Sequence, residues 1–425
     1  MKAVIRQACE TFTRQAFSSN KPKEVWRIIH RILKPNQQPL GQDPNKLNSF
    51  FACTAERTLP VSSDLPFCLE ELIESLPDDS HANFKLRKVS HGEVLRMLKL
   101  LRSDTSTGPD GIPVKFVKMV ADSIADPLTA IINNCIRKYY FPKAWKNARI
   151  SPIPKVDQPK SEEHFRPISI LRTLSKVFEK FVMLQITTFC ESESVLRDTI
   201  FSFRKGHSTN TVVMGMHDDL PRAVKKGEVT LMVLADFSEA FGTVNYKVLI
   251  TKLSTLGFSE LFLRWFKSYL SERSHFVQID DLTSESVNTR FDVPQGSILG
   301  SMLFNLYVSD LQDHLPSSIG SFQYADDTTI YSSCPAPELE RCVQEVNSTL
   351  NTVSSWTNDS HIALNSKKTK TMLLSTSQMS HVHSLGKNQP AITISDSTLE
   401  YVNVSKLLGV HFHQHFNWDE HVQAT

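Results

Sequence analysis

Two adjacent aspartates, Asp326 and Asp327, stand between two short runs of strand-forming residues. The runs are Ser321-Phe-Gln-Tyr324 and Thr328-Thr-Ile-Tyr331, so the segment predicts a β-hairpin with an acidic tip. Asp is common in tight turns because its side chain can bond to its own backbone, and the tip can therefore be an ordinary polar turn. The other interpretation is a cation site, since neighbouring carboxylates repel each other unless a cation lies between them. Oxygen ligands of this kind suit Mg²⁺, which one or two carboxylates hold together with substrate phosphates.

A third carboxylate, Asp236, ends the apolar run Leu231-Met-Val-Leu-Ala235. A short continuous apolar run of this kind predicts a buried strand, with Asp236 at its C-terminal tip. If this strand lies beside the Asp326-Asp327 hairpin, the three carboxylates converge at one edge of a sheet. Such a group can hold two metal ions, one lowering the pKa of an attacking hydroxyl and one stabilising a leaving phosphate oxygen. That arrangement is typical of in-line phosphoryl or nucleotidyl transfer.

Composition limits the class of protein but not its partners. The chain has 425 residues, 40% of them hydrophobic and 22% charged, which is enough globular material for two or three domains. The net charge of +2 is too small to indicate a partner. The 7 cysteines are scattered without a CxxC pair, which predicts free thiols in a reducing compartment. Neither a signal peptide nor an apolar run near the ~18 residues of a membrane span is present, so an intracellular protein without a membrane segment is expected.

Basic residues outnumber acidic ones between residues 137 and 180. Such a run is either a solvated face or a phosphate-facing surface, and charge alone does not separate the two. The basic positions are Lys138, Lys143, Lys146, Arg149, Lys155, Lys160, Arg166, Arg172 and Lys176.

The hydrophobic pattern predicts an α+β chain. Residues 60–79 contain three prolines and are expected to form a connector. Helices are expected at 24–33, 90–101, 113–140, 174–189, 246–256, 260–270, 297–311 and 338–356. Strands are expected at 145–155, 165–171, 231–236, 275–279, 288–293, 370–375, 391–394 and 406–412.

Several phrases occur in a fixed order along the chain. Three of them carry the acidic and glycine positions: Ala235-Asp-Phe-Ser-Glu-Ala-Phe241, Val293-Pro-Gln-Gly-Ser-Ile-Leu-Gly300 and Tyr324-Ala-Asp-Asp327. The accompanying phrases are Thr107-Gly-Pro-Asp-Gly-Ile112, Phe141-Pro-Lys-Ala-Trp145, Ile153-Pro-Lys155, Phe165-Arg-Pro-Ile-Ser169, Phe203-Arg-Lys-Gly-His-Ser-Thr209, Leu364-Asn-Ser-Lys-Lys-Thr369 and Leu407-Leu-Gly-Val410. In this order they resemble the core motifs of reverse transcriptases from non-LTR (LINE-type, jockey-like) retrotransposons. The resemblance covers roughly residue 90 to the C-terminus; the ordered set is specific, although no single phrase is.

The resemblance implies roles for the three carboxylates and the large aromatic nearby. Asp236 and Asp326 match the metal ligands of the family, and Asp327 matches the neighbouring carboxylate. Two Mg²⁺ ions would bind there, with Mn²⁺ as a substitute. Phe241 occupies the bulky position that excludes a ribose 2′-OH, although it can equally be a core aromatic.

The resemblance also implies contacts with nucleotide and primer. Lys155 and Arg166 match triphosphate contacts, and Arg suits bidentate phosphate binding. Lys368 matches a basic residue near the leaving phosphate, or else it is a solvated loop lysine. Gln295-Gly296 lies where the family packs the template–nucleotide pair, and a residue without Cβ allows close approach of backbone. Leu408-Gly409 matches the segment that supports the primer end.

As a whole, the resemblance implies a right-hand polymerase of the α+β class with fingers and palm, its thumb largely missing. The expected units are an N-terminal helical extension at 1–85, fingers at 86–228, and a palm with the primer-supporting segment at 229–425. The reverse transcriptase domain as a whole would cover about 135–415. The expected reaction adds dNTPs to a DNA primer 3′-OH on an RNA template, and the expected location is the nucleus.

Four positions depart from the family pattern: Ser202 replaces a usual Gly, Gly242 a usual Asp, Asp292 a usual Gly and Ser301 a usual Pro. None of them removes a metal ligand. Three alternatives stay open at this point. The chain could be an inactive or fragmentary retroelement-derived protein that binds nucleic acid without polymerising, an RNA-templated RNA polymerase, or a host-adopted interaction protein.

Overall fold

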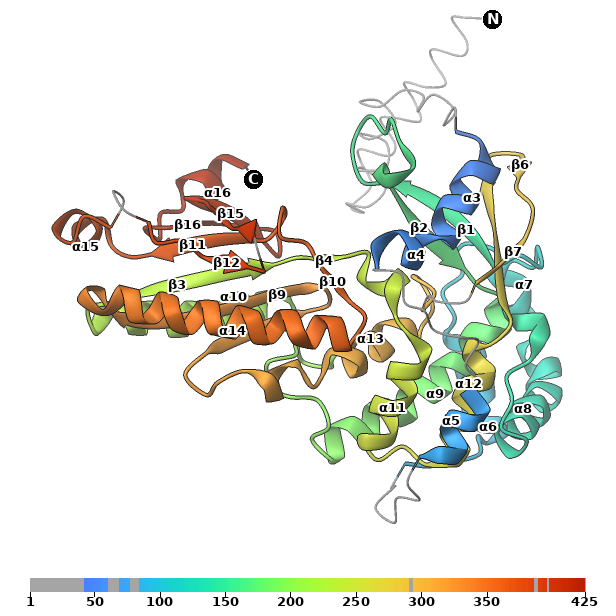
Figure 1. Cartoon of the computed structure of the whole chain (residues 1–425). Coiled ribbons are helices and arrows are strands. Elements are labelled where there is room, and N and C mark those ends of the chain that lie inside the picture. The colour runs from blue at the N-terminus through green and yellow to red at the C-terminus, as the bar shows by residue number, and fades with distance from the viewer. Residues whose placement is uncertain are drawn as a thin grey trace, which may run out of the picture.

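The structure is a computed structural model, and it describes residues 42–59, 69–76, 84–289, 293–385, 389–395 and 397–424. Figure 1 shows two parts, each built around a β-sheet, with helices packed on and between them. Helices and mostly antiparallel sheets are mixed along the chain, so the expected α+β class is confirmed. Among the described residues, none of the helices combines the length and the apolar character needed to cross a membrane.

The first sheet has the strand order β14-β11-β3-β9-β8. Its central strand is β3 (Glu228–Ala235), which lies antiparallel to β9 (Asp327–Pro335) on one side and to β11 (Lys370–Leu374) on the other. Strand β8 (Gly320–Tyr324) forms a hairpin with β9, and β14 (Glu400–Tyr401) runs parallel to β11. The predicted apolar strand and the predicted acidic hairpin are therefore direct neighbours.

Two helices cover opposite faces of this sheet, because successive strand side chains point to opposite sides. Met232 of β3 belongs to the same buried cluster as Met216 of α10 (Thr209–Lys225). Leu231 and Val233 belong to the other cluster, which includes the buried residues of α14 (Leu339–Asp359). The acidic end of β3 is thus held in a rigid, three-layer arrangement.

The second sheet joins strands that are far apart in the sequence. Its order is β2 (Phe165–Ile170), β1 (Asn147–Pro154), β5 (Arg273–Ile279) and β6 (Leu282–Thr283), and β7 (Val287–Thr289) also pairs with β5. Helix α3 (Pro44–Ala52) packs on this sheet through Leu47 and Phe51, which share a buried cluster with Ile150 and Val277. Strands β5–β7, which follow β3 in the chain, therefore belong to the sheet of β1 and β2.

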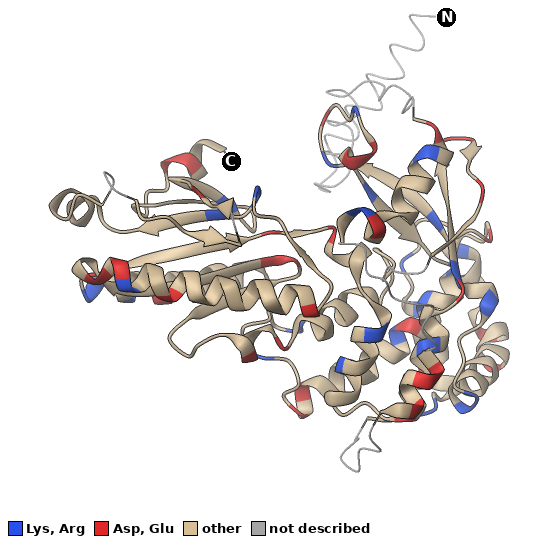
Figure 2. Ribbon diagram, viewed as in Figure 1, with Lys and Arg blue, Asp and Glu red and all other residues tan. Residues whose placement is uncertain are grey.

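Helices fill the space below the second sheet. They are α5 (Leu69–Ser75), α6 (His91–Leu100), α7 (Val114–Met119), α8 (Ala121–Arg137), α9 (Thr173–Ser192), α11 (Tyr246–Thr255) and α12 (Glu260–Leu270). Ser90 and Glu93 form a reciprocal capping box at the start of α6, where the sequence predicts a helix. Acidic residues of α5 face basic residues of α12 (Figure 2), where Glu70 pairs with Arg264 and Lys267.

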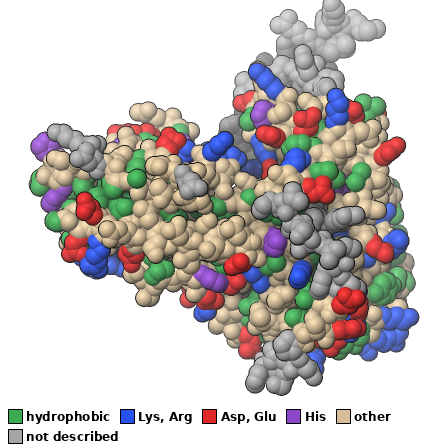
Figure 3. All heavy atoms as spheres, in the orientation of Figure 1, with side chains coloured by type: hydrophobic (Ala, Val, Ile, Leu, Met, Phe, Trp, Pro, Cys, Tyr) green, Lys and Arg blue, Asp and Glu red, His purple; other side chains and the backbone are tan. Residues whose placement is uncertain are grey.

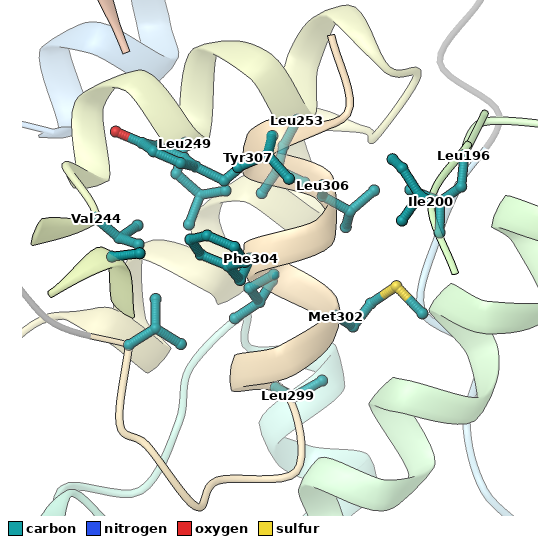
Figure 4. Close-up of a cluster of buried hydrophobic side chains, with 14 of the residues drawn as sticks. Leu196, Ile200, Val244, Leu249, Leu253, Leu299, Met302, Phe304, Leu306 and Tyr307 are labelled. Carbon is teal, nitrogen blue, oxygen red and sulfur yellow. The ribbon is translucent and has the colours of Figure 1, made fainter. Parts of the chain in front are cut away.

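Helix α13 (Gly300–Val308) is buried on nearly all sides. Figure 4 shows its side chains packed against neighbouring helices, with Phe304 and Tyr307 among Val244, Leu249 and Leu253. A helix that is hydrophobic all round belongs in a core, so α13 is a firm base for the loop that precedes it.

Short elements complete the described chain. They are α4 (Thr54–Thr58), η1 (Lys143–Trp145), η2 (Glu162–His164), β4 (Phe237–Ser238), η3 (Ala240–Thr243), η4 (Leu311–His314), η5 (Ala336–Glu338), β10 (Ala363–Leu364), α15 (Ser377–Val382), β12 (Thr393–Ile394), β13 (Ser397–Thr398), β15 (Val404–Leu407), β16 (Val410–His413) and α16 (Asp419–Ala424).

Several sequence expectations need correction. The helix expected at 113–140 is two helices, because the chain leaves helical geometry at Val120. The single strand expected at 406–412 is the β15–β16 hairpin, which turns at Leu408-Gly409. The 60–79 connector contains α5, α13 begins at Gly300 rather than at 297, and α10 was not expected. The helix expected at 24–33 lies outside the described residues.

Candidate active site

Asp236 and the Asp326-Asp327 tip meet at one end of the first sheet. The register of β3 and β9 pairs Ala235 with Thr328, so Asp236 follows directly opposite Asp327. The same edge receives the turn between β8 and β9, where Tyr324 pairs with Asp327 and leaves a two-residue loop. The expected convergence of the three carboxylates at a sheet edge therefore follows from the strand register.

The hairpin loop has a constrained backbone. Ala325 has a φ of 55°, which is uncommon for a residue with a Cβ. A positive φ at the first of two loop residues is a feature of type II′ turns, whose twist suits a β-hairpin. The turn thus holds Asp326 at the outer tip while Asp327 begins β9.

The charges of Asp236 and Asp326 shift the pKa values of neighbouring carboxyl groups in this site. Burial, followed by the charges of Asp326 and Asp236, raises the pKa of Asp327 to about 6, and Arg166 opposes this shift. The pKa of Asp236 is also raised, mainly by burial and then by Asp326 and Glu239, against the effect of Lys368. A cation bound here would favour the ionised form of these carboxyl groups, because its charge offsets their mutual repulsion.

The donor set fits a hard divalent cation that is completed by a substrate. Within the described residues, no three His, Cys, Asp or Glu side chains form a ready-made metal-binding group. Mg²⁺ does not require one, since it commonly binds through one or two carboxylates plus substrate phosphates. The carboxylate oxygens of Asp236, Asp326 and Asp327 are therefore chemically suited to a hard divalent cation whose remaining positions are filled by other ligands.

Lys368 lies beside Asp236 because a short loop is tied to the end of β3. The backbone N–H of Asp236 donates to Thr369 Oγ1 at 3.2 Å, and the N–H of Asn365 donates to the Asp236 carbonyl at 2.8 Å. The N–H of Lys368 in turn donates to the Asn365 carbonyl at 3.2 Å. The loop therefore places the Lys368 cation where it lowers the pKa of Asp236.

Two further cations predicted from the sequence lie on the second sheet, at the end of β1 and on β2. Lys155 Nζ pairs with Glu239 Oε1 at 3.0 Å, and its charge also lowers the pKa of Asp236. Glu239 has a left-handed φ of 47° and follows Ser238 of β4. Arg166 is close enough to lower the pKa of Asp327. Figure 3 shows basic side chains where the two parts of the molecule meet.

The Gln295-Gly296 loop is pressed against the end of β2. The N–H of Ser169 donates to the Gln295 carbonyl at 2.6 Å. Gly296 has a φ of 105°, and a Cβ there would lie 2.7 Å from the Ser169 carbonyl oxygen. This position therefore requires glycine for reasons internal to the protein.

Glu179 of α9 fixes the other side of this loop, and sequence reasoning did not identify it. Its side chain is fully buried. It accepts hydrogen bonds from the Ile298 N–H at 2.8 Å and from Ser175 Oγ at 3.1 Å. Burial raises the pKa of this carboxyl, while Arg273 and the hydrogen bonds lower it. Apart from Ser175 on the same helix, the partners of Glu179 are distant in sequence, so no local pattern marks its role.

A cavity of about 470 Å³ lies between these pieces. Most of the predicted nucleotide contacts line it, as does the hairpin tip. Phe241 forms one wall, and its ring stacks on Phe304 at 4.5 Å between centroids, so this aromatic is both a lining and a core residue. The lining residues are Arg166, Phe203, Phe241, Pro294, Gln295, Gly296, Ser297, Gly300, Ser301, Ala325 and Asp326.

Leu408-Gly409 is not part of this cavity lining. Both residues have positive φ, 49° and 88°, as a two-residue type I′ hairpin turn requires. Leu408 packs against the cluster shared by α10 and β11. The β15–β16 hairpin, which forms a separate two-stranded sheet, thus packs against the first sheet through Leu408 and does not line the cavity.

The departures from the family pattern have structural counterparts where they are described. Ser202 Oγ donates to Asn305 Oδ1 at 2.7 Å, so its hydroxyl bridges to α13. Gly242 lies against α4, where a Cβ would approach Thr54 Cγ2 to 2.8 Å. Ser301 lines the cavity. Asp292 lies outside the described residues.

The family described as "Reverse transcriptase (RNA-dependent DNA polymerase)" matches residues 153–410. A Drosophila melanogaster protein named "Probable RNA-directed DNA polymerase from transposon BS" is 29% identical over 364 residues, which is 84% of this chain and 39% of that protein.

Two further relatives come from the same organism. The "RNA-directed DNA polymerase from mobile element jockey" is 23% identical, covering 94% of this chain and 44% of that protein. The "Probable RNA-directed DNA polymerase from transposon X-element" is 26% identical, covering 89% of this chain and 41% of that protein. The chain spans well under half the length of each of these relatives. Since the family match covers more than half of the chain and contains all three carboxylates, the chain belongs to the reverse transcriptase family, of the type found in non-LTR, jockey-like retrotransposons.

Proposed function

We propose that this chain is the polymerase part of a retrotransposon reverse transcriptase that adds dNTPs to a DNA primer 3′-OH on an RNA template. The observation that carries this proposal is the placement of Asp236 opposite Asp327, at the sheet edge where Asp326 lines a cavity with Arg166 and Gly296. An acidic edge beside cationic groups suits transfer of a nucleotide from its triphosphate.

The two sheets support a right-hand arrangement. The first sheet with α10 and α14 corresponds to a palm, and the second sheet with its helices corresponds to fingers. Strands β5–β7 follow β3 in the chain but pair with β1, which supports counting them with the fingers rather than with the palm. The reverse transcriptase domain would then span about 135–415, with Leu408-Gly409 as the primer-supporting turn.

In this proposal Asp236, Asp326 and Asp327 hold two Mg²⁺ ions, or Mn²⁺ in their place. When bound, the metal supplies charge that activates the primer hydroxyl and stabilises the leaving pyrophosphate. The phosphates are bound by Lys155, Arg166 and Lys368. Glu239 holds the Lys155 side chain in place until a triphosphate takes the position of the Glu239 carboxylate. The hydrogen bond from the Ser169 N–H to the Gln295 carbonyl fixes the loop that supports the base pair.

In this proposal Phe241 determines the selectivity for deoxyribose over ribose in the incoming nucleotide. Its ring is backed by Phe304, so it cannot retreat readily when a ribose 2′-OH approaches. Primer extension on an RNA template, with dNTPs and with rNTPs in parallel, tests both template and substrate class. We expect dNTP incorporation by the parent and a marked gain of rNTP incorporation by Phe241→Ala. Template–primer binding without extension in Mg²⁺ or Mn²⁺ would instead favour an inactive retroelement-derived protein.

A nuclear location accompanies this proposal, because integration of such elements primes on chromosomal DNA. Fluorescence microscopy of the tagged chain tests it, and exclusion from the nucleus would contradict it.

A further inference from the structure

We propose that Phe203 is a stacking platform for a nucleobase in the cavity. The inference rests on the proposed function, because it requires a template–nucleotide pair beside Gln295-Gly296. Phe203 lines the cavity together with Phe241, yet its side chain is 46% exposed. An exposed aromatic by itself is ordinary, so the argument depends on how the surrounding loop is built.

The backbone at Phe203 is held in an unfavourable conformation. Its φ is 57°, in the left-handed region that bulky residues seldom occupy. Such a conformation is unfavourable and persists only where neighbouring contacts determine it. Those neighbouring contacts are present on both sides of Phe203.

On the N-terminal side, the chain is tied to the hairpin strand β8 and to α13. The N–H of Phe201 donates to the Gln323 carbonyl at 2.9 Å, and the Phe201 ring packs 5.8 Å from that of Phe322. Ser202 and Asn305 exchange two hydrogen bonds, Ser202 Oγ to Asn305 Oδ1 at 2.7 Å and Asn305 Nδ2 to the Ser202 carbonyl at 2.6 Å. Both Ser202 and Asn305 are buried.

On the C-terminal side, Arg204 is locked in place. Its side chain is 7% exposed and pairs with both carboxylate oxygens of Glu191, at 3.1 and 3.2 Å. It also donates to the carbonyls of Arg197 and Ile200, at 2.9 and 3.1 Å. The two residues that flank Phe203 therefore point into the protein, whereas Phe203 itself lines the cavity.

The chemistry of the cavity identifies the ligand as a flat, apolar-faced group next to phosphate. Arg166 and Asp326 mark the phosphate and metal side, whereas Phe203 and Phe241 supply apolar walls. The Phe241 ring is already stacked on Phe304, while no aromatic ring of the described residues packs on Phe203. A nucleobase meets this description, and stacking on an aromatic contributes about 1–3 kcal/mol per base without selecting among bases. The base belongs either to the template or to the incoming nucleotide.

The test compares Phe203→Ala and Phe203→Trp with the matched control Phe116→Ala, which removes another exposed phenylalanine on α7. From the stacking energy, we expect Phe203→Ala to raise the apparent KM for dNTPs by about 5- to 100-fold. Phe203→Trp keeps the KM near the parent value because it keeps an aromatic face. Phe116→Ala leaves it unchanged.

A binding measurement separates this inference from the proposed function. In the Asp326→Asn background, which blocks extension, 2-aminopurine is placed at the templating position or supplied as the incoming nucleotide. The arm whose fluorescence is quenched with Phe203 and restored with Phe203→Ala identifies the stacked base. If Phe203→Ala matches Phe116→Ala in quenching, the inference is wrong, whether or not the parent polymerises; where the parent extends, an equal KM for the two variants contradicts it as well. If the parent fails to extend but quenching depends on Phe203, the inference stands and the proposed polymerase activity does not.

Discussion

Gly242 and Thr54 are packed so closely that there is no room for a larger side chain at Gly242. A Cβ on Gly242 would lie 2.8 Å from Thr54 Cγ2, and Thr54 is buried, with its hydroxyl donating to the Phe51 carbonyl at 2.8 Å. The N-terminal α3–α4 segment thus packs directly against η3, the turn that follows Asp236 in the chain. The glycine that departs from the family pattern is matched to this contact.

We therefore expect Gly242→Asp to destabilise the protein by about 1–3 kcal/mol through overpacking. Thr54→Ser removes Cγ2 but keeps the hydroxyl, so it should recover most of that loss in the double variant. Urea unfolding of the two single variants and the double variant measures the coupling. Additive effects would show that the contact does not limit this site.

Glu179 should control the loop that supports the base pair. Glu179→Ala leaves the partly buried Ile298 N–H without an acceptor, which costs about 1–3 kcal/mol of unfolding free energy. Glu179→Gln keeps one acceptor oxygen and should retain most of the stability and the KM for dNTPs. Chemical unfolding and extension kinetics of both variants check this. Equal losses in the two variants would assign the role to charge rather than to the hydrogen bond.

The acidic edge of the first sheet should lower the stability of the protein when no metal is bound. Because the pKa of Asp327 is raised from its ordinary value near 4 to about 6, ionising this carboxyl costs folding free energy at pH 7, and the cost declines as the pH falls from about 6 to about 4. Asp327→Asn should therefore raise stability at pH 7 in metal-free buffer. We expect a gain of only about 1 kcal/mol, because Asp327 as a whole is exposed, so solvent screens much of the effect that its surroundings have on the carboxylate. Thermal melts with and without Mg²⁺ should show a larger metal-induced rise in Tm for the parent than for Asp327→Asn, and equal rises would contradict the account.

His275 predicts a distinct acid sensitivity. It is buried on β5, and burial lowers its pKa to about 4 despite an opposing backbone hydrogen bond at Asn48. The unfolded chain therefore binds a proton first as the pH falls below the usual histidine value. Stability present above about pH 6.5 should decline towards pH 4, by up to about 3 kcal/mol from this residue. Unfolding free energies of the parent and His275→Gln across this range test the point, and identical slopes would exclude His275 as the cause.

The sequence was most informative where structure is local. The apolar run ending at Asp236 and the alternation around Asp326-Asp327 each specify a strand, and their pairing brings the carboxylates together. Residues 406–412 were expected to form a single strand, yet Leu408 adopts a φ of 49° beside Gly409. Here tertiary packing of Leu408 overrides its local preference.

Long-range contacts explain what the sequence did not reveal. Glu179 bonds to a loop 119 residues away, so its buried carboxylate resembles an ordinary helix residue until the fold is known. Phe203 stood inside a recognised phrase, but only the anchoring of Ser202 and Arg204 shows that its ring is presented to the cavity. The pairing of β5 with β1 likewise joins strands on either side of β3 in the chain.

Primer extension on an RNA template annealed to a DNA primer, with Mg²⁺ and dNTPs, tests the central claim most directly. The variants are Asp236→Asn and Asp326→Asn, and the matched control is Asp281→Asn, from the Asp280-Asp281 turn of another hairpin, β5–β6. We predict extension by the parent and the control, and a loss of at least about 100-fold in kcat for the first two variants, because the transition-state charge loses its support. Extension by Asp236→Asn and Asp326→Asn at the parental rate would contradict the assignment of this acidic edge as the catalytic centre.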